Sequence, residues 1–430
     1  MSNENAAAGI PPKILRAHYD HVAGCYYVND AWGGYIRNKE GDLVLRLRAA
    51  GLSTKSPDGA ALSPVEVRIL EIQNTESIAY AGPLAGFAKG VHTILGQRIL
   101  VTTSPVPIGP KPGEWCVLQQ LLKNLFGEQV VYVYGWLKYA VECLQLGKLA
   151  PGQALCIIGE HAAGKSLVQN LITLILGGRS AKPYRYMSGA TTFNSELFGA
   201  EHLMIEDEPA SRDLRTRKKF GAEIKLMIAS ETQSCHPKGR PAISLTPFWR
   251  LTISLNPEPE SLLTLPPLDD SLEDKIILLR AAKQPMPMPT SGLRDREIFW
   301  KRLVDELPAF VNFLLNWPIP EALKSQRFGI THYHDPEVRK AIDTLAPETR
   351  LLELIDATIL TVRKTNWTGS AAELEEALAG SDKAYEARVL FDFASAAGTY
   401  LGRLALSNPK RVEKLTTGNG NRWLIHPPEQ

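Results

Sequence analysis

The sequence has few cysteines, and those it has are far apart. Five cysteines occur in 430 residues, at Cys25, Cys116, Cys143, Cys156 and Cys235, with no C-x-x-C pair. Zinc ribbons and disulfide frameworks need cysteines at short, repeated spacings, so this pattern argues against both and suits a reducing compartment. Apolar runs near the ~20 residues that span a bilayer are also missing. The first residues lack the basic and apolar regions of a signal peptide. We therefore expect a cytoplasmic protein without membrane contact.

An excess of charge of one sign is missing as well. Forty-eight Lys and Arg residues nearly balance 46 Asp and Glu residues, which gives a formal net charge of +2. A near-neutral total neither indicates nor excludes nucleic-acid binding, because a basic stripe can lie within a balanced surface. The hydrophobic share of 44% is typical of a globular protein, and the length predicts two or three domains.

What the sequence does contain is a complete phosphate-binding loop. Residues 159–166 read GEHAAGKS, which matches G-x-x-x-x-G-K-[ST], with an apolar strand-like run before them and a helical run after them. In such loops backbone N–H groups surround phosphate oxygens, and the helix N-terminus adds positive potential. We predict that ATP binds here, with Lys165 at the β- and γ-phosphates and Ser166 at Mg²⁺. The predicted contact residues are Gly159, Glu160, His161, Ala162, Ala163, Gly164, Lys165, Ser166 and Leu167.

A second apolar run, at residues 202–208, ends in acids. Its sequence, HLMIEDE, predicts a strand that opens into carboxylates about forty residues after the loop. Asp207 is the candidate Mg²⁺ ligand and Glu208 the candidate that activates water. Glu206 takes one of these roles if the register slips by a residue. The alternative is a strand that simply ends in solvated acids.

A third strand is predicted at 249–255 and is followed by Asn256. An amide at the carboxyl end of a parallel strand can hydrogen-bond both a γ-phosphate and the attacking water, and ligands bind at that edge of open α/β sheets. The alternative is that Asn256 only forms a turn or cap before Pro257.

The segment CHPKGRP, at 235–241, is a basic turn between two runs that could pair as a hairpin. We expect His236, Lys238 and Arg240 at its tip, where cations could grip a nucleic-acid backbone. Incidental charge on a solvated hairpin is the alternative.

Composition and periodicity predict an α/β protein of five segments. These are a small mixed α+β N-terminal domain at 1–112, a collar-like helical segment at 113–150, a P-loop core with a parallel sheet at 151–285, a helical extension at 286–346, and a winged-helix-like C-terminal domain at 347–430. The last rests on helix-like runs at 351–362, 370–378 and 390–404, followed by a Gly/Asn-turned hairpin. The aromatic residues Tyr26, Tyr27, Trp32 and Tyr35 are expected in the N-terminal core, with base stacking as the alternative.

The ordered set GEHAAGKS, LMIEDE, IKLMIASETQSCHPKG and WRLTISLN, over roughly 120 residues, resembles the superfamily 3 helicases of the AAA+ class. The closest resemblance is to the primase-helicase-like branch of phages, poxviruses and mobile elements. It implies an AAA+ core, a homo-hexameric ring with ATP sites between subunits, and movement along single-stranded DNA, typically 3′ to 5′, driven by pore hairpins. It also implies roles for individual residues: Asp207 and Glu208 as Walker B acids, Asn256 as phosphate sensor, and His236 and Lys238 as pore-hairpin cations.

Two features depart from that family. Relatives usually place an arginine after the sensor strand that reaches the neighbouring subunit's ATP, whereas this sequence offers Lys275, then Arg280 about a helical turn further on. Lysine is a weaker substitute for planar phosphate contacts, so Arg215 and Arg217 are candidates too. The first 112 residues also show no paired-acid primase site, so a primase or replication initiator would be a separate partner.

The main hypothesis is therefore an ATP-dependent DNA helicase that binds single-stranded or forked DNA during replication of a phage, plasmid or other mobile genetic element. One alternative is an AAA+ initiator or loader that binds duplex through the third C-terminal helix and a wing around Arg422. The other is a nucleotide-gated scaffold without unwinding activity.

Overall fold

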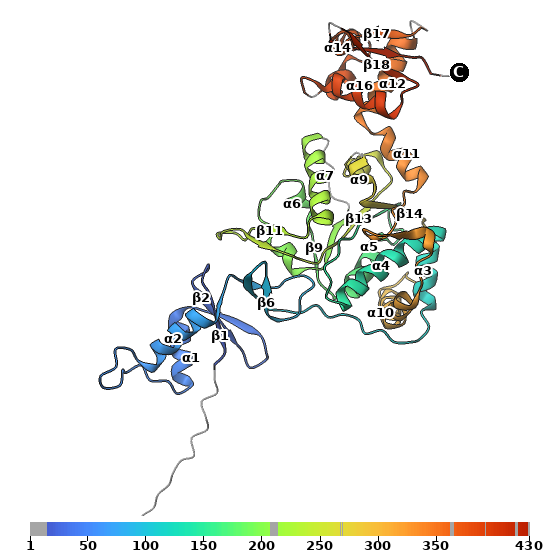
Figure 1. The fold of residues 1–430 in the computed structure, drawn as a ribbon. Helices are drawn as coiled ribbons and strands as arrows, with labels where there is room; N and C mark the ends of the chain where they lie inside the picture. Colours follow the sequence, from blue (N-terminus) through green and yellow to red (C-terminus); the bar gives the residue numbers. More distant parts are fainter. Residues whose placement is uncertain are drawn as a thin grey trace, which may run out of the picture.

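The chain forms three groups of elements in a row. The structure is a computed structural model and describes residues 15–206, 214–266, 268, 270–361, 365–391, 393–417 and 420–428. Figure 1 shows the N-terminal elements in blue at one end, a central group around β8 to β14, and the C-terminal elements in orange and red at the opposite end.

A parallel sheet of five strands lies at the centre, in the order β14-β8-β13-β10-β9. Its strands are β8 (Ala154–Gly159), β9 (Ser180–Ala181), β10 (His202–Glu206), β13 (Arg250–Leu255) and β14 (Ile276–Ala281). The predicted parallel sheet is thus confirmed. Because β13 lies between β8 and β10, the segments that follow these three strands leave from one edge, side by side.

Both faces of this sheet are covered, which explains why its strands are apolar throughout rather than alternating. Leu155 and Ile157 point to one face, where α5 (Lys165–Ile175), α3 (Cys116–Phe126), α4 (Val130–Gln145) and α10 (Leu293–Asn316) pack. Cys156 and Ile158 point to the other face, towards α7 (Leu214–Ala229). The start of α4 is rich in valine and tyrosine, yet it is helical because its apolar stripe is buried against α10 and the sheet.

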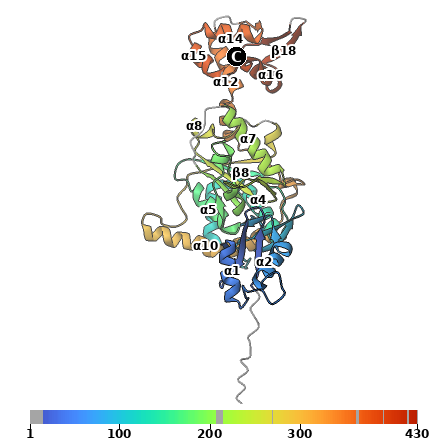
Figure 2. The same ribbon diagram turned by 90° about the vertical axis from the view of Figure 1, so that its left-hand side faces the viewer.

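The N-terminal elements form a small sheet with helices on one side. Its strand order is β3-β2-β1-β4, from β1 (Ala17–Asp20), β2 (Cys25–Asn29), β3 (Tyr35–Asn38) and β4 (Ser77–Ile78). Helices α1 (Glu40–Ala49) and α2 (Pro64–Thr75) pack against Tyr26 and Val28 (Figure 2).

A second small sheet, β5-β7-β6, follows, from β5 (Tyr80–Gly82), β6 (Gly90–Ile94) and β7 (Gln97–Val101). Its apolar side chains join the core of the central sheet. The apolar cores therefore divide before Tyr80, whereas the sequence suggested one domain up to residue 112.

The C-terminal elements have a core of their own. They are α12 (Pro347–Ile355), a π-helical turn (Asp356–Leu360), β17 (Trp367–Gly369), α14 (Ala371–Ala379), α15 (Ala384–Leu390), α16 (Ala396–Ser407), β18 (Val412–Thr417) and β19 (Gly420–Ile425). The strands form an antiparallel sheet in the order β17-β19-β18. The expected single helix at 390–404 is wrong, because Leu390 ends α15 in the core and Ser395 begins α16 as its N-cap.

Short elements complete the chain: η1 (Gly127–Gln129), α6 (Tyr184–Met187), η2 (Ser195–Gly199), β11 (Gln233–Cys235), β12 (Ile243–Leu245), α8 (Pro259–Leu262), α9 (Asp270–Glu273), η3 (Glu321–Leu323), β15 (Lys324–Ser325), β16 (Gly329–Ile330) and α11 (Pro336–Thr344). Across the described ranges, no helix is both long enough and apolar enough to cross a bilayer.

Candidate nucleotide-binding site and hairpin

The backbone between β8 and α5 has the shape of a phosphate cradle. Ala162 and Gly164 have positive φ angles of 60° and 107°, which turn successive N–H groups inward. Gly159 is required for a different reason: a Cβ there would lie 2.5 Å from the carbonyl oxygen of Ala281 on β14. Helix α5 begins directly at Lys165, so its first-turn N–H groups face the loop.

The side chain of Lys165 is buried at the carboxyl edge of the sheet. Its Nζ donates to the carbonyl oxygens of Gly159 at 2.5 Å and Glu160 at 2.9 Å, and to Oδ1 of Asn256 at 2.9 Å. Asn256 directly follows β13, which pairs with β8. The sheet therefore brings together two residues that lie 91 positions apart and that the sequence singled out separately.

Of the three acids that end the second predicted strand, Glu206 is the last residue of β10. Asp207 and Glu208 lie outside the described residues, so their predicted roles stay predictions. Glu206 is paired in register with Ser254, two residues before Asn256, so β10 ends at the edge that carries Lys165. Its carboxylate lies 3.0 Å from Nζ of Lys182.

Ser166 is exposed in the first turn of α5, next to Lys165 in the chain. A hydroxyl is a hard oxygen ligand of the kind that Mg²⁺ accepts beside phosphate oxygens, so the residue present fits the predicted ion.

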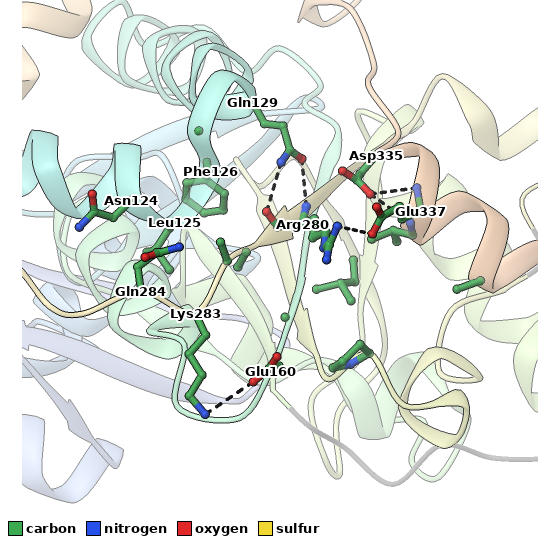
Figure 3. Close-up of a pocket in the computed structure, with 18 of the residues that line it drawn as sticks. Asn124, Leu125, Phe126, Gln129, Glu160, Arg280, Lys283, Gln284, Asp335 and Glu337 are labelled. Carbon is green, nitrogen blue, oxygen red and sulfur yellow. Dashed lines mark hydrogen bonds and ion pairs between the residues drawn. The ribbon is translucent and has the colours of Figure 1, made fainter.

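A pocket of about 860 Å³ opens beside the loop (Figure 3). Its walls come from the end of α3, from η1, from the loop at Gly159 and Glu160, from the end of β14 and from α11. Gln129 of η1 connects two of these walls through hydrogen bonds to β14. Its side chain accepts from the backbone N–H of Arg280 at 3.0 Å and donates to the backbone carbonyl of Arg280 at 3.2 Å. This pocket has no sequence signal, because segments more than two hundred residues apart build it.

The candidates for an arginine that reaches a neighbouring subunit differ sharply in position. Lys275 lies at the amino end of β14, opposite the phosphate loop, with its Nζ 2.6 Å from Asp274. The expected helical turn between it and Arg280 is wrong, because the apolar residues 276–281 form β14 in the buried sheet. Arg280 is exposed in its own subunit's pocket and is ion-paired with Glu337 of α11. Arg217 is buried, donates to the carbonyl of Leu265 at 2.9 Å, and has a pKa lowered by burial, so it is enclosed in its own subunit. The side chain of Arg215 lies outside the described part of the chain.

The predicted hairpin is present, with β11 and β12 antiparallel and Cys235 opposite Ile243. Lys238 is exposed at the tip, next to Gly239 with φ 73°. His236 and Arg240, which were expected at the tip with Lys238, each contact another segment of the chain. The backbone N–H of His236 donates to Oδ1 of Asn194 at 2.7 Å while its ring lies 5.2 Å from that of Phe193. Arg240 contacts the buried carboxylate of Asp20 at 3.4 Å, so it joins the hairpin to the N-terminal sheet.

Beneath the phosphate loop, a buried histidine connects α5 to two strands. The ring nitrogens of His202 on β10 lie 2.7 Å from the hydroxyl of Thr173 on α5 and 2.8 Å from that of Thr252 on β13. Gln169 of α5 donates to the same Thr252 hydroxyl at 2.8 Å. Burial lowers the pKa of His202 to about 3, so the ring is neutral wherever the protein is folded near neutral pH.

This histidine predicts a loss of stability in mild acid. In the unfolded chain this histidine binds a proton below its pKa of 6.5, whereas in the folded chain it binds one only below its pKa of about 3. The free energy of unfolding therefore falls as the pH is lowered from about 6.5 to about 3. At pH 5 the contribution of His202 is about 2 kcal/mol. We expect His202→Gln to lose less stability than the wild type between pH 7.5 and pH 5, measured as urea midpoints at both values. Equal losses in the two proteins would contradict this account.

The comparisons with known proteins give a fold and little more. Residues 157–270 match a family described as "Family of unknown function (DUF5906)", and no curated protein matches the chain. Among solved structures, the A form of the apo NrS-1 C-terminal region aligns at 12% identity with a TM-score of 0.55, over 96% of this chain and 97% of that one. A second apo structure of that region aligns at 13% identity with a TM-score of 0.54, over 96% of both chains.

This chain therefore shares the fold of the NrS-1 C-terminal region over nearly its whole length. A structure described as "SCCmec type IV Cch - active helicase" also aligns, at 10% identity over 92% of this chain and 73% of that one. Its TM-score is 0.32.

Proposed function

We propose that this protein is an ATP-dependent DNA helicase of the superfamily 3 type, which works as a hexameric ring in the replication of a phage, plasmid or other mobile genetic element. The observation that carries the proposal is the contact between Lys165 and Asn256. It lies at the edge where β8, β10 and β13 end, beside a pocket large enough for a base and ribose.

In this proposal the triphosphate of ATP lies in the loop and the nucleoside in the pocket. Phosphate oxygens compete with the carbonyls of Gly159 and Glu160 and with Asn256 for the ammonium of Lys165. Asn256 is then released to bond the γ-phosphate or the attacking water, and its contact with Lys165 returns when phosphate leaves. Asp207 and Ser166 would hold Mg²⁺, which supplies charge neutralisation for phosphoryl transfer. Glu208 would accept a proton from water.

Strand β13 of the central sheet connects the nucleotide site to the β11–β12 hairpin. β12 ends at Leu245 and the chain runs through the buried Phe248 and Trp249 into β13, whose far end carries Asn256. A change at the carboxyl end of β13 is therefore transmitted along one buried strand to the base of the hairpin. Lys238 at the tip provides the charge that contacts the DNA backbone.

The C-terminal elements support the rest of the proposal. Helices α12, α14 and α16, with β17 and the β18–β19 hairpin, have the order of a winged helix, and we assign residues 347–430 to such a domain. We keep the other domain boundaries that the sequence predicts, with one change: β5, β6 and β7 are assigned to the central domain, because their apolar side chains lie in its core.

The test is ATP hydrolysis with and without single-stranded DNA, together with unwinding of a duplex that carries a single-stranded tail. We expect DNA to stimulate hydrolysis several-fold and the tailed duplex to be separated only with hydrolysable ATP. ATP-dependent DNA binding without unwinding would favour the initiator or loader. Hydrolysis that DNA does not change, with no DNA binding, would favour the nucleotide-gated scaffold.

A further inference from the structure

The N-terminal sheet has one face that no helix covers among residues 15–206 and the other described ranges. Successive side chains of a strand point to opposite faces, and α1 and α2 pack on the face of Tyr26 and Val28 (Figures 1 and 2). The other face carries His18, Tyr27 and Arg37, which are aligned across β1, β2 and β3 by the register of the strands. Tyr35 lies two residues before Arg37 and therefore on the same face.

This uncovered face is aromatic and basic. Nζ of Lys89 lies 4.8 Å from the centre of the Tyr35 ring, and the ring of His18 lies 6.1 Å from it on the same face. Arg37 is exposed, and Tyr27 and Tyr35 are half-buried, so their ring surfaces are partly open to solvent. Trp32, at the turn between β2 and β3, is 94% exposed. An indole with so little packing contributes almost nothing to the fold.

The carboxylates that border this face are already engaged. Asp20 pairs with Arg240, and Glu76 pairs with Arg98 at 2.9 Å and with His18 at 3.3 Å. Asp30 accepts from the backbone N–H groups of the turn that carries Trp32. Among the residues that the structure describes, no carboxylate forms an ion pair with Arg16, Arg37 or Lys89. The open charge on this side is therefore positive.

We propose that this face binds single-stranded nucleic acid, with bases stacked on Trp32 and Tyr35 and phosphates contacted by Arg37 and Lys89. A sheet with helices on one side and aromatic side chains on the other is a general solution for holding unstacked bases, since every base has a ring face to stack. Trp32 lies at the turn where the strand would enter, and Arg240 at the other end of β1 joins the same sheet to the hairpin. The face thus offers a second contact for the strand that the hairpin holds.

The experiment measures binding of full-length protein to a fluorescent oligo(dT) by anisotropy, without nucleotide and at low salt. Trp32→Ala/Arg37→Ala changes two exposed side chains, so the fold should be kept, as circular dichroism would show. We expect its Kd to rise at least about tenfold, because each stacked base contributes roughly 1–3 kcal/mol. The matched control is Tyr385→Ala/Arg388→Ala, an exposed aromatic and cation on α15, which should bind as the wild type does.

Photocrosslinking with 5-iodouracil in the same oligonucleotide locates the contact. Crosslinks within residues 17–38 are expected, whereas crosslinks confined to the hairpin, an unchanged Kd in the double variant, or an equal loss in the control would overturn the proposal. Neither measurement needs ATP hydrolysis, and both can be repeated in Lys165→Ala. If the wild type fails to unwind DNA but Trp32→Ala/Arg37→Ala still weakens DNA binding, the helicase proposal is refuted and the binding surface is supported. If the wild type unwinds DNA and the double variant binds normally, the binding surface is refuted and the helicase proposal is supported.

Discussion

Replacing Lys165 by alanine is expected to lower the rate of ATP hydrolysis at least about 100-fold, as is usual when a preorganised charge at a transition state is removed. The ammonium of Lys165 lies between the phosphate loop and Asn256, where the proposed phosphoryl transfer would develop negative charge. The fold should be retained, because the side chain donates to two carbonyls of its own loop and to Asn256 and lies in no apolar core of the described residues, while the positive φ angles of Ala162 and Gly164 belong to the backbone.

Steady-state phosphate release gives the rate, and circular dichroism with a thermal melt checks the fold. Lys301→Ala removes an exposed lysine on α10 that pairs only with Asp305 among the described residues, and it serves as the matched control. Near-normal turnover in Lys165→Ala, with the control also normal, would mean that ATP is hydrolysed elsewhere or not bound by this loop.

The second large effect is expected from the hairpin. His236→Ala/Lys238→Ala should abolish the stimulation of hydrolysis by DNA and lower the unwinding rate at least about tenfold, while ATP hydrolysis without DNA stays within about twofold of the wild type. The fold of the hairpin should persist, because Asn194 holds the backbone of residue 236 and the strand pairing does not involve either side chain.

The structure also predicts which of the two single substitutions in the hairpin has the larger effect. Lys238 is exposed at the tip while the ring of His236 rests against Phe193, so Lys238→Ala alone should cause most of the loss. His332→Ala/Lys340→Ala removes an exposed histidine and lysine outside the hairpin and should unwind normally. If unwinding survives the double substitution in the hairpin, the strand is moved by another part of the protein.

Much of the fold follows from short-range pattern. The phosphate loop, the buried strands around it and the hairpin could be predicted, because strand periodicity, glycine positions and a basic turn are all local signals. The Val-rich start of α4 shows where local preference fails: its residues favour a strand, and burial of the apolar stripe makes them helical.

The candidate site also has features that the sequence could predict and features that it could not. Lys165 and Asn256 could be paired from sequence because parallel strands end at one edge. Burial of Arg217, the ion pair of Arg280 with Glu337, and the contact of Arg240 with Asp20 could not be foreseen, because each depends on a segment far away in the chain. Three arginines that look alike in the sequence therefore have different surroundings: Arg217 is buried, Arg280 lies at the pocket, and Arg240 lies between the hairpin and the N-terminal sheet.

Helix α11 forms one side of the pocket beside the phosphate loop through Glu337, Val338 and Ala341, and two residues after it the chain enters the C-terminal body. A fragment cut at the end of the central sheet would therefore lack one wall of this pocket. If ATP binds in this pocket as we propose, a fragment that binds it has to include all of α11, and a label on the C-terminal body should sense the binding.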